Sequence, residues 1–459
     1  MSDYSLQEIS KYIGGELFGS DKLVSGFSID SRTIKNNDVF ICIKGENYDG
    51  HNFIEDILSK AACVVTSNDI DKIDFSKQSY IKVSNTFEAL QKMSEYVRSL
   101  SNAKFIAITG SNGKTTVKEM LAHILSDHDV TYTKGNYNNH IGVPLTLLSI
   151  NKNDNFVILE VGSNKPGEIK PLTKLINPDI AAVTNIGYAH IEGFKSLENT
   201  AHEKYCIYES LKKGGVAVIN NEDKYLRVTT KKNKIYFGYE KSFYTKLYMT
   251  LKNIFGKTDF LDIKKINNNT IEISHNKTSA TIKMKLHGEH NFMNAACASS
   301  IAVSLGIPLP HIKSKIESFI AVSSRLKLHE LNNNINIIDD CYNANPSSFK
   351  AALDYLSKIE GTKIVLMGDM VELGKDSKFF HKEIGEYAKK LNIDKFISIG
   401  VDSKLASDVF SRDGKHFTDH NSLKYYLNNN IESNSYILIK GSRSAQLEEY
   451  VDYLKSRSN

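Results

Sequence analysis

The sequence predicts an α/β protein with a doubly wound parallel sheet at its centre and further α/β units on either side. Three observations support this fold class. An apolar strand, a glycine-rich loop and a helix follow one another at residues 105–120. Apolar strands then alternate with helical stretches to about residue 320, and a second alternation begins at about residue 321. A chain of 459 residues is also too long for one ordinary core.

The stretch around residues 105–120 has the layout of a phosphate-binding loop. The apolar run Phe105–Ile108 predicts a buried strand, and helical periodicity begins at Thr115. The glycines between them let backbone N–H groups turn toward a phosphate, and the helix N-terminus adds partial positive charge. The loop is the short form Gly-x-x-Gly-Lys-Thr, because Ile108 stands where the full motif has its first glycine. Lys114 is expected to reach the terminal phosphates and Thr115 to bind magnesium; the alternative is a glycine-rich turn with a chance lysine.

The first hundred residues predict a small mixed α/β unit. Asn85, with Glu88 three residues later, predicts the start of a helix that runs through Leu100. Strands are expected at residues 38–43, 62–66 and 80–83, and a short helix at 53–60. Arg32 follows another expected strand and could pair with a phosphate, although a solvated arginine in a turn is the simpler interpretation.

The central region predicts an α/β sheet whose strand ends carry polar side chains. Strands are expected at residues 130–133, 156–160, 180–184 and 216–219, and two short strands near 270–284 indicate a β-rich insertion between about 242 and 285. Glu160 ends one strand and His190 closely follows another, on the edge where ligands bind in such sheets. Each could instead make ordinary capping or loop hydrogen bonds. Their coincidence with the phosphate loop favours a metal site.

The last region predicts another α/β domain, with strands at residues 335–340, 363–367, 395–399 and 435–439.

The composition is that of a folded soluble chain, with 41% hydrophobic and 24% charged residues. The net charge of +5 suits anionic small substrates, and no Lys/Arg cluster interleaved with aromatics suggests nucleic acid. Five scattered cysteines without Cys-x-x-Cys spacing predict a reduced, cytoplasmic protein. Neither a signal peptide nor a membrane-spanning segment is expected.

The chain resembles the Mur ligase family in motifs that follow one another along its whole length. The stretches that carry the resemblance are Thr109–Thr116, Leu159–Gly162, Ala189–Phe194, Gly288–Asn294 and Asp339–Pro346. Within the family, Gly135–Thr146 and the Tyr-Asn-Ala-Asn-Pro form of residues 342–346 are similar to the member that adds a dipeptide.

The resemblance implies a three-domain Mur ligase architecture. Its expected parts are a UDP-sugar-binding N-terminal domain at 1–103, a central ATP-binding P-loop domain with the β-rich insertion at 104–320, and a Rossmann-like C-terminal domain at 321–459 that closes on ATP and the incoming dipeptide. It implies an ATP-dependent ligase of peptidoglycan precursor synthesis that acts through an acyl phosphate. The implied substrates are UDP-N-acetylmuramoyl-tripeptide and D-alanyl-D-alanine, and a monomer is expected.

The resemblance also implies roles for individual residues. Lys114, His190 and Lys204 are expected to be catalytic, with Thr115 and Glu160 holding one magnesium ion and His190 and a carbamylated Lys204 holding a second. The residues expected to bind ATP are Gly110, Ser111, Asn112, Gly113, Lys114, Thr115, Thr116, Asn294, Arg325, Asp340 and Tyr342. The residues expected to bind the UDP-linked substrate are Ser31, Arg32, Asn138 and Asn139.

Two other functional interpretations remain. One is a related amide ligase, either the family member that adds the third peptide residue or a folylpolyglutamate synthase. The dipeptide-type motifs at 135–146 and 342–346 argue against both. The other is a non-catalytic homologue that binds UDP sugars as a sensor or scaffold. Such a protein should have lost a residue such as Lys114, Glu160 or Lys204, and all three are present.

Overall fold

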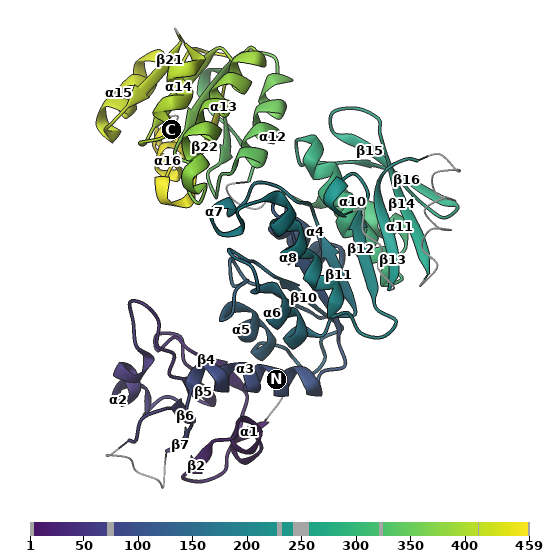
Figure 1. The fold of residues 1–459 in the computed structure, drawn as a ribbon, viewed down its shortest axis with the longest axis vertical. Helices are drawn as coiled ribbons and strands as arrows, with labels where there is room; N and C mark the ends of the chain where they lie inside the picture. The colour runs from purple at the N-terminus through teal and green to yellow at the C-terminus, as the bar shows by residue number, and fades with distance from the viewer. Residues whose placement is uncertain are drawn as a thin grey trace.

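The structure is a computed structural model that describes residues 4–70, 78–226, 232–241, 257–320, 325–411 and 413–457. Three main sheets, each built from its own part of the chain, form three lobes that follow one another from the N-terminus to the C-terminus (Figure 1). This arrangement confirms the predicted three-part α/β architecture.

The N-terminal lobe is a five-stranded sheet in the order β2-β7-β6-β5-β4, parallel except for β2. Its strands are β2 Glu16–Phe18, β4 Gly26–Ser28, β5 Asp38–Ile41, β6 Cys63–Thr66 and β7 Ser79–Lys82, and β1 Tyr4–Ser5 pairs separately with β3 Leu23–Val24. The lobe's helices are α1 Leu6–Ile13, α2 Ile54–Ile57 and α3 Thr86–Leu100. The helix expected at 53–60 is shorter at both ends: the 3-10 helix η1 (Gly50–Phe53) precedes it, and it ends at Ile57, after which residues 58–60 form a turn.

Helix α3 joins the N-terminal lobe to the central one. It begins where predicted, because the Asn85 side chain accepts hydrogen bonds from the backbone N–H groups of Phe87 and Glu88. Its buried face, which includes Leu90 and Val97, belongs to one hydrophobic cluster with side chains of both lobes. A shared apolar core of this kind fixes the two lobes against each other.

The central lobe is a nine-stranded sheet in the order β16-β15-β14-β13-β12-β11-β8-β10-β9. Its strands are β8 Lys104–Thr109, β9 Val130–Tyr132, β10 Phe156–Glu160, β11 Ile180–Val183, β12 Val216–Asn220, β13 Asn233–Tyr239, β14 Thr258–Lys265, β15 Thr270–His275 and β16 Thr278–Lys283. The helices are α4 Lys114–Ile124, α5 Gly142–Leu148, α6 Ile169–Ile176, α7 Ile191–Phe194, α8 Leu197–Glu209, α10 Glu289–Ser304 and α11 Leu309–Ser318. Strands β8 to β14 pair in parallel, so their carboxyl ends meet along one edge.

The central strand β8 separates two hydrophobic cores. Phe105 and Ala107 belong to the core that is shared with α3, whereas Ile106 and Ile108 belong to the core under α4 and α10. Side chains alternate between the two faces of a strand, so a continuous apolar run is what a doubly covered strand requires. The short apolar sequence before the glycine loop is therefore explained by burial on both faces.

The expected β-rich insertion continues the central sheet. Strand β14 pairs in parallel with β13, and the hairpin β15–β16 adds two antiparallel strands at the edge. This hairpin lies at the side of the sheet away from the N-terminal lobe (Figure 1). Residues 242–256 of the predicted insertion lie outside the described residues.

The C-terminal lobe is a six-stranded sheet in the order β17-β18-β22-β19-β20-β21, parallel except for the edge strand β17. The strands are β17 Lys327–Glu330, β18 Asn336–Asp340, β19 Thr362–Met367, β20 Lys395–Ile399, β21 Gly414–Phe417 and β22 Ser435–Lys440. The helices are α12 Pro346–Ser357, α13 Ser377–Lys390, α14 Lys404–Phe410, α15 His420–Asn430 and α16 Glu448–Ser456. Hydrophobic clusters cover both faces, as a parallel sheet requires.

The cysteines and the helices bear on two predictions made from composition. All five cysteines are free and buried, two in the N-terminal lobe, two in the central lobe and one in the C-terminal lobe. Burial raises the pKa of the Cys42 and Cys63 thiols to about 12. Of the helices in the described parts of the chain, none combines the length and the apolar character that a membrane crossing needs.

Candidate active site

The glycine loop joins β8 to α4, and its backbone takes conformations that suit glycine alone. Gly110 has φ +146° and Gly113 has φ +81°. A Cβ atom on Gly110 would lie 1.8 Å from Oγ1 of Thr184, and one on Gly113 would lie 2.2 Å from Oδ1 of Asn294. Neither position has room for a side chain. The loop is therefore pressed against β11 on one side and α10 on the other.

Residues after β11 hold the loop from behind. The Asn112 N–H donates to Asn185 Oδ1 (3.0 Å), and the Asn112 carbonyl accepts from Thr184 Oγ1 (2.5 Å). The Ser111 hydroxyl exchanges hydrogen bonds with the backbone of Gly187 (2.8 and 3.0 Å). These bonds use side chains that the sequence motif leaves undefined. They fix the loop before any ligand arrives.

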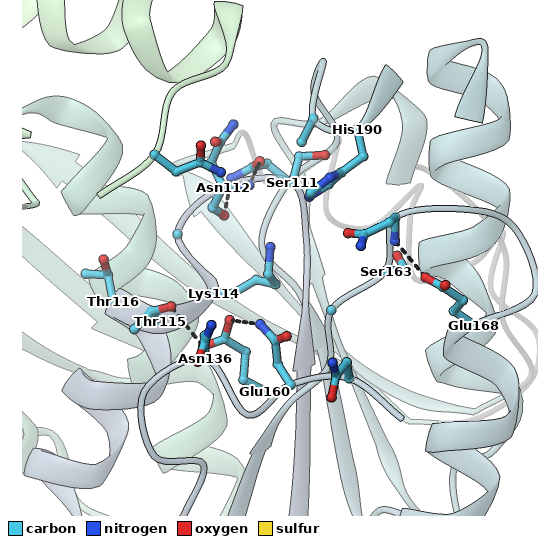
Figure 2. A pocket seen from close by; sticks show the side chains of 18 of the residues that line it. Ser111, Asn112, Lys114, Thr115, Thr116, Asn136, Glu160, Ser163, Glu168 and His190 are labelled. Carbon is cyan, nitrogen blue, oxygen red and sulfur yellow. Dashed lines mark hydrogen bonds between the residues drawn. The ribbon is translucent and has the colours of Figure 1, made fainter. Parts of the chain in front are cut away.

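A buried carboxylate lies beside the start of α4. Glu160 ends β10 and is 2% exposed, and its carboxylate accepts from Thr115 Oγ1 and Asn138 Nδ2, both at 2.9 Å. In Figure 2, the side chains of Thr115 and Glu160 lie below that of Lys114. The Glu160 backbone N–H donates to Thr133 Oγ1 (3.0 Å). Thr115 and Glu160, the two residues expected to hold one magnesium ion, are therefore in direct contact.

A second lysine on α4, Lys118, helps to position the Glu160 carboxylate through Thr133. No role was predicted for Lys118 from the sequence. Lys118 is completely buried, and its Nζ donates to the backbone carbonyl of Thr133 (2.7 Å). Thr133 is the residue whose hydroxyl accepts from the Glu160 backbone. The signal available in the sequence was a lysine on an otherwise apolar face of the predicted helix, because a charge buried there needs a partner.

The two predicted catalytic lysines are both desolvated. Lys114 Nζ donates to the Gly110 carbonyl (2.8 Å), and burial lowers the pKa of Lys114. Lys204 on α8 is 1% exposed, and its Nζ lies 3.5 Å from the Ser163 hydroxyl. Burial, and secondarily the Lys114 cation, lowers the pKa of Lys204 to about 7. The amine of Lys204 therefore loses its proton more readily than the amine of a surface lysine does.

His190 lies on the loop between β11 and α7 and has the left-handed φ of +53°. Its Nδ1 atom lies 2.6 Å from Oε2 of Glu372, a residue of the C-terminal lobe. Although the atoms are this close, Nδ1 has no aligned hydrogen-bond partner, so the carboxylate approaches the imidazole from outside the N–H direction. The adjacent His190 imidazole lowers the pKa of Glu372.

The C-terminal lobe contacts the glycine loop and the start of α4 through two side chains, the predicted Arg325 and Asn345, to which the sequence assigned no role. Arg325 Nη2 donates to Thr115 Oγ1 (3.1 Å), and the guanidinium lies 4.2 Å from the ring centroid of Tyr342. Asn345 Nδ2 donates to Asn112 Oδ1 (2.7 Å). In this structure, the first residues of the C-terminal lobe thus already contact the glycine loop.

Asp340 is held by a lysine at the end of the neighbouring strand. Lys440, at the carboxyl end of β22, is 2% exposed and pairs with Asp340 (2.5 Å) and with the Asn343 carbonyl (3.0 Å). The sequence analysis did not assign Lys440 a role. Its position at a strand end, on the edge where ligands bind, was the signal that could have found it.

One cavity of about 1390 Å³ brings most of the predicted residues together. Those that line it are Ser111, Asn112, Gly113, Lys114, Thr115, Thr116, Asn138, Asn139, Glu160, His190, Asn294, Arg325, Asp340 and Tyr342. Gly110 and Lys204 contact this lining from behind, through Lys114 and Ser163 respectively. The cavity therefore has contributions from both the central and the C-terminal lobes.

Four predicted substrate residues divide into two pairs. Asn138 donates a hydrogen bond to Glu160. The side-chain oxygen of Asn139 accepts hydrogen bonds from the backbone N–H groups of Ile141 and Gly142, at the start of α5. Ser31 and Arg32 lie outside the cavity, in the turn after β4. The Arg32 side chain is 85% exposed and pairs with Asp30 (2.7 Å).

The oxygen ligands of the site suit magnesium. Among the described residues, no three His, Cys, Asp or Glu side chains come together to hold a metal by themselves. Thr115 and Glu160 supply a hydroxyl and a carboxylate beside a phosphate-binding loop. Magnesium is commonly held by one or two such groups with substrate phosphates and water completing its shell. The residues therefore fit this ion.

Comparisons with known proteins agree with this geometry. Three family models match in chain order: "Mur ligase family, catalytic domain" at residues 23–99, "Mur ligase middle domain" at 108–302 and "Mur ligase, glutamate ligase domain" at 324–443. Two relatives are named UDP-N-acetylmuramoyl-tripeptide–D-alanyl-D-alanine ligase. The one from Escherichia coli is 34% identical, with 99% of each chain covered. The one from Haemophilus influenzae is 33% identical, covering 100% of this chain and 99% of its own.

Solved structures are similar over nearly the whole chain. A crystal structure of MurF from Acinetobacter baumannii has a TM-score of 0.87 at 27% identity, with 99% of each chain covered. MurF from Thermotoga maritima, crystallised with ADP, has a TM-score of 0.78 at 24% identity, covering 94% of this chain and 97% of its own. The second likeness concerns the fold alone. All three lobes are thus present in both relatives.

We predict that Gly113→Ala weakens triphosphate binding at least about tenfold, because a Cβ there collides with Asn294 and the positive φ is strained. Calorimetric titration with a non-hydrolysable ATP analogue measures the change. Gly214→Ala is the matched control, since Gly214 shares φ +81° but has nothing within 4 Å of its added Cβ. Equal affinities in two folded variants would contradict the close-packing argument.

Proposed function

The chain belongs to the Mur ligase family, and from this premise we propose that it joins D-alanyl-D-alanine to UDP-N-acetylmuramoyl-tripeptide with the consumption of ATP. The full-length relatives named above carry the names of this ligase. The dipeptide-type motifs at 135–146 and 342–346 point to the same member of the family. The observation that carries the proposal is the meeting of Lys114, Thr115, Glu160 and Arg325 at one cavity.

The proposed reaction has two steps. A carboxylate oxygen of the tripeptide attacks the γ-phosphorus of ATP, the bond to the β-phosphate oxygen breaks, and ADP leaves. The amine of D-alanyl-D-alanine then attacks the carbonyl carbon of the acyl phosphate. Inorganic phosphate leaves, the amine loses a proton and an amide remains. Two anions must approach in the first step, so catalysis depends on cations that are already in position.

The described residues provide these cations. Lys114 projects from the start of α4, where backbone N–H groups also face the phosphates. Arg325 lies beside Thr115 and can reach a terminal phosphate from the opposite lobe. Bound magnesium would neutralise phosphate charge and orient the γ-phosphate. We propose that Thr115 and Glu160 hold one ion and that His190 and Lys204 hold a second.

Lys204 can hold a cation only after modification, because an ammonium repels metal ions. We propose that carbon dioxide converts its amine to a carbamate, which is a carboxylate. The modification needs a neutral amine, and burial makes Lys204 easier to deprotonate than an exposed lysine. The Ser163 hydroxyl, 3.5 Å from Nζ, is available to donate to a carbamate oxygen.

The remaining roles belong to substrate recognition. We propose that Asn294, Asp340 and Tyr342 contact the adenosine part of ATP from α10 and the C-terminal lobe. Ser31 and Arg32 are proposed to bind the diphosphate, since the exposed Arg32 fork is free to exchange Asp30 for a phosphate. Asn138 and Asn139 are proposed to contact the sugar and the peptide.

The domain boundaries at residues 103 and 320 remain part of the proposal. Support comes from the ends of the sheets, because β8 begins at Lys104 and β17 of the third sheet begins at Lys327.

We further propose that the protein works in the cytoplasm. All five cysteines are free thiols, which suits a reducing compartment.

We predict that Lys114→Ala lowers the rate of phosphate release at least about a hundredfold, because a preorganised cation is lost at the transferred phosphate. The fold should remain, since Lys114 contributes to no apolar core. A phosphate assay on samples quenched at successive times measures the rate of phosphate release, and the unfolding temperature shows whether the variant is folded. Lys152→Ala, which removes an exposed lysine of the same lobe, should behave like the wild type. A fully active, folded Lys114→Ala protein would remove this residue from the mechanism.

We predict that Lys204→Ala is inactive and that short carboxylic acids such as acetate partly restore its activity, by supplying the missing carboxylate. The same acids should leave Lys114→Ala inactive, because that variant lacks a cation. Mass spectrometry of the intact wild-type protein with and without bicarbonate tests for the carbamate itself. Wild-type activity of Lys204→Ala would exclude the modification as a requirement.

We predict that the purified protein releases phosphate from ATP only when UDP-N-acetylmuramoyl-tripeptide, D-alanyl-D-alanine and magnesium are all present. Replacing the dipeptide by diaminopimelate or L-lysine, each with its own UDP-linked acceptor, tests the family member that adds the third residue. Folate with glutamate tests a folylpolyglutamate synthase. Tight binding of the UDP sugar without phosphate release for any amine would favour a non-catalytic homologue.

A further inference from the structure

The C-terminal lobe contacts the segment that carries His190 through a loop after β19. Besides the 2.6 Å contact between Glu372 Oε2 and His190 Nδ1, the Glu192 N–H donates to the Glu372 carbonyl (3.0 Å). A Cβ on Gly374 would lie only 3.3 Å from Cβ of Glu192. The lobes therefore meet here through a carboxylate, a backbone hydrogen bond and a close glycine contact. All three contacts join residues 190–192 to residues 372–374.

Both residues of this contact have a backbone conformation that residues other than glycine rarely adopt. His190 has φ +53° and Glu372 has φ +64°. Such conformations persist only where surrounding contacts enforce them, and they concentrate at functional sites. The Glu372 loop is held by the Ser442 hydroxyl, which accepts from the Val371 N–H (2.8 Å). His190 is held by Gly193, whose N–H donates to the His190 carbonyl (2.9 Å).

The position of the carboxylate determines what the imidazole can do. A carboxylate at Nδ1 favours the tautomer with its proton on Nδ1, which leaves the Nε2 lone pair for another ligand. Histidines that bind metals usually donate their second N–H to such a group, and the donation fixes the ring orientation. Here the carboxylate is close but not aligned with the N–H direction. A small movement of the C-terminal lobe would change that alignment.

We propose that Glu372 is a positioning residue that orients His190 toward the second metal ion, so that this ligand is set only when the C-terminal lobe is docked. The inference rests on the proposed role of His190 as a metal ligand. Glu372 itself is not among the residues that line the cavity. Its effect would link metal binding in the central lobe to the position of a lobe that also supplies Arg325.

The alternative is that Glu372 only holds the lobes together. The two possibilities differ in what a variant changes. Loss of an interlobe contact should lower the unfolding temperature and leave the metal affinity of the folded protein as it was. Loss of a positioning group should weaken metal binding even where the protein remains folded.

The test measures binding of Mn²⁺, a paramagnetic substitute for magnesium, to the full-length protein with ADP by electron paramagnetic resonance. Glu372→Ala and Glu372→Gln should weaken binding of one ion about 10- to 100-fold, the range found when partners of metal-ligating histidines are removed. Glu372→Asp should restore part of the affinity. Glu192→Gln is the matched control, since it neutralises an exposed carboxylate beside the same histidine and should bind Mn²⁺ like the wild type.

A second variant tests the dependence on lobe docking. Gly374→Val keeps Glu372 but pushes against Glu192, and hydrogen exchange of the Glu192 amide reports whether the contact has opened. Where that amide exchanges faster, Mn²⁺ binding should weaken as it does in Glu372→Ala. Faster exchange with unchanged Mn²⁺ affinity would exclude the coupling.

His190→Ala separates this inference from the proposed function. If His190→Ala binds Mn²⁺ like the wild type, His190 is not a metal ligand and both proposals are wrong on this point. If His190→Ala weakens binding and Glu372→Ala does not, the role of Glu372 alone is wrong. A lower unfolding temperature of Glu372→Ala with unchanged Mn²⁺ affinity would likewise reduce Glu372 to a contact between lobes.

Discussion

The site depends on a carboxylate that is buried at the end of a strand. Taking the Glu160 charge out of water is costly unless donors and cations surround it. Thr115 and Asn138 donate to it directly, and Lys118 holds the Thr133 residue to which the Glu160 backbone donates. These partners come from α4, the loop before α5 and the end of β9. The position of each of these segments is thus tied to one anionic group, which in turn is available to a cation.

The lobes are attached to the central sheet in different ways. Helix α3 buries its apolar face in a core shared by the N-terminal and central lobes. The C-terminal lobe contacts the glycine loop and the start of α4 through the polar side chains of Asn345 and Arg325. It also has apolar contacts with the central lobe, because Ile191 joins one of its hydrophobic clusters and the ring of Tyr188 lies 5.0 Å from that of Phe380. Opening a polar contact costs little net free energy, because water replaces the lost hydrogen bonds, whereas exposing apolar surface to water is costly. The N-terminal lobe therefore shares an extensive apolar core with the central lobe, whereas, among the described residues, Ile191 is the central-lobe residue that joins the hydrophobic clusters of the C-terminal lobe.

The sequence predicts those parts of the molecule whose causes are local. The strand before the glycine loop, the Asn85 cap and the sheet-by-sheet alternation depend on residues close together in the chain, and all of them form. The contacts of Asn185, Lys440 and Glu372 join residues far apart in sequence, and no local pattern specifies them. The hairpin β15–β16 shows the same limit. Its strands were expected, but their addition to the central sheet depends on pairing with β14, which periodicity does not reveal.

The distribution of the cysteines gives each lobe its own chemical reporter. A thiol reacts as the thiolate, so burial and a raised pKa keep these side chains inert while the lobe around them is folded. Cys341 marks the C-terminal lobe alone, whereas Cys42 and Cys63 mark the N-terminal one. An alkylating reagent followed by peptide mapping would therefore record the order in which the lobes open. The native sequence allows this measurement without any added label.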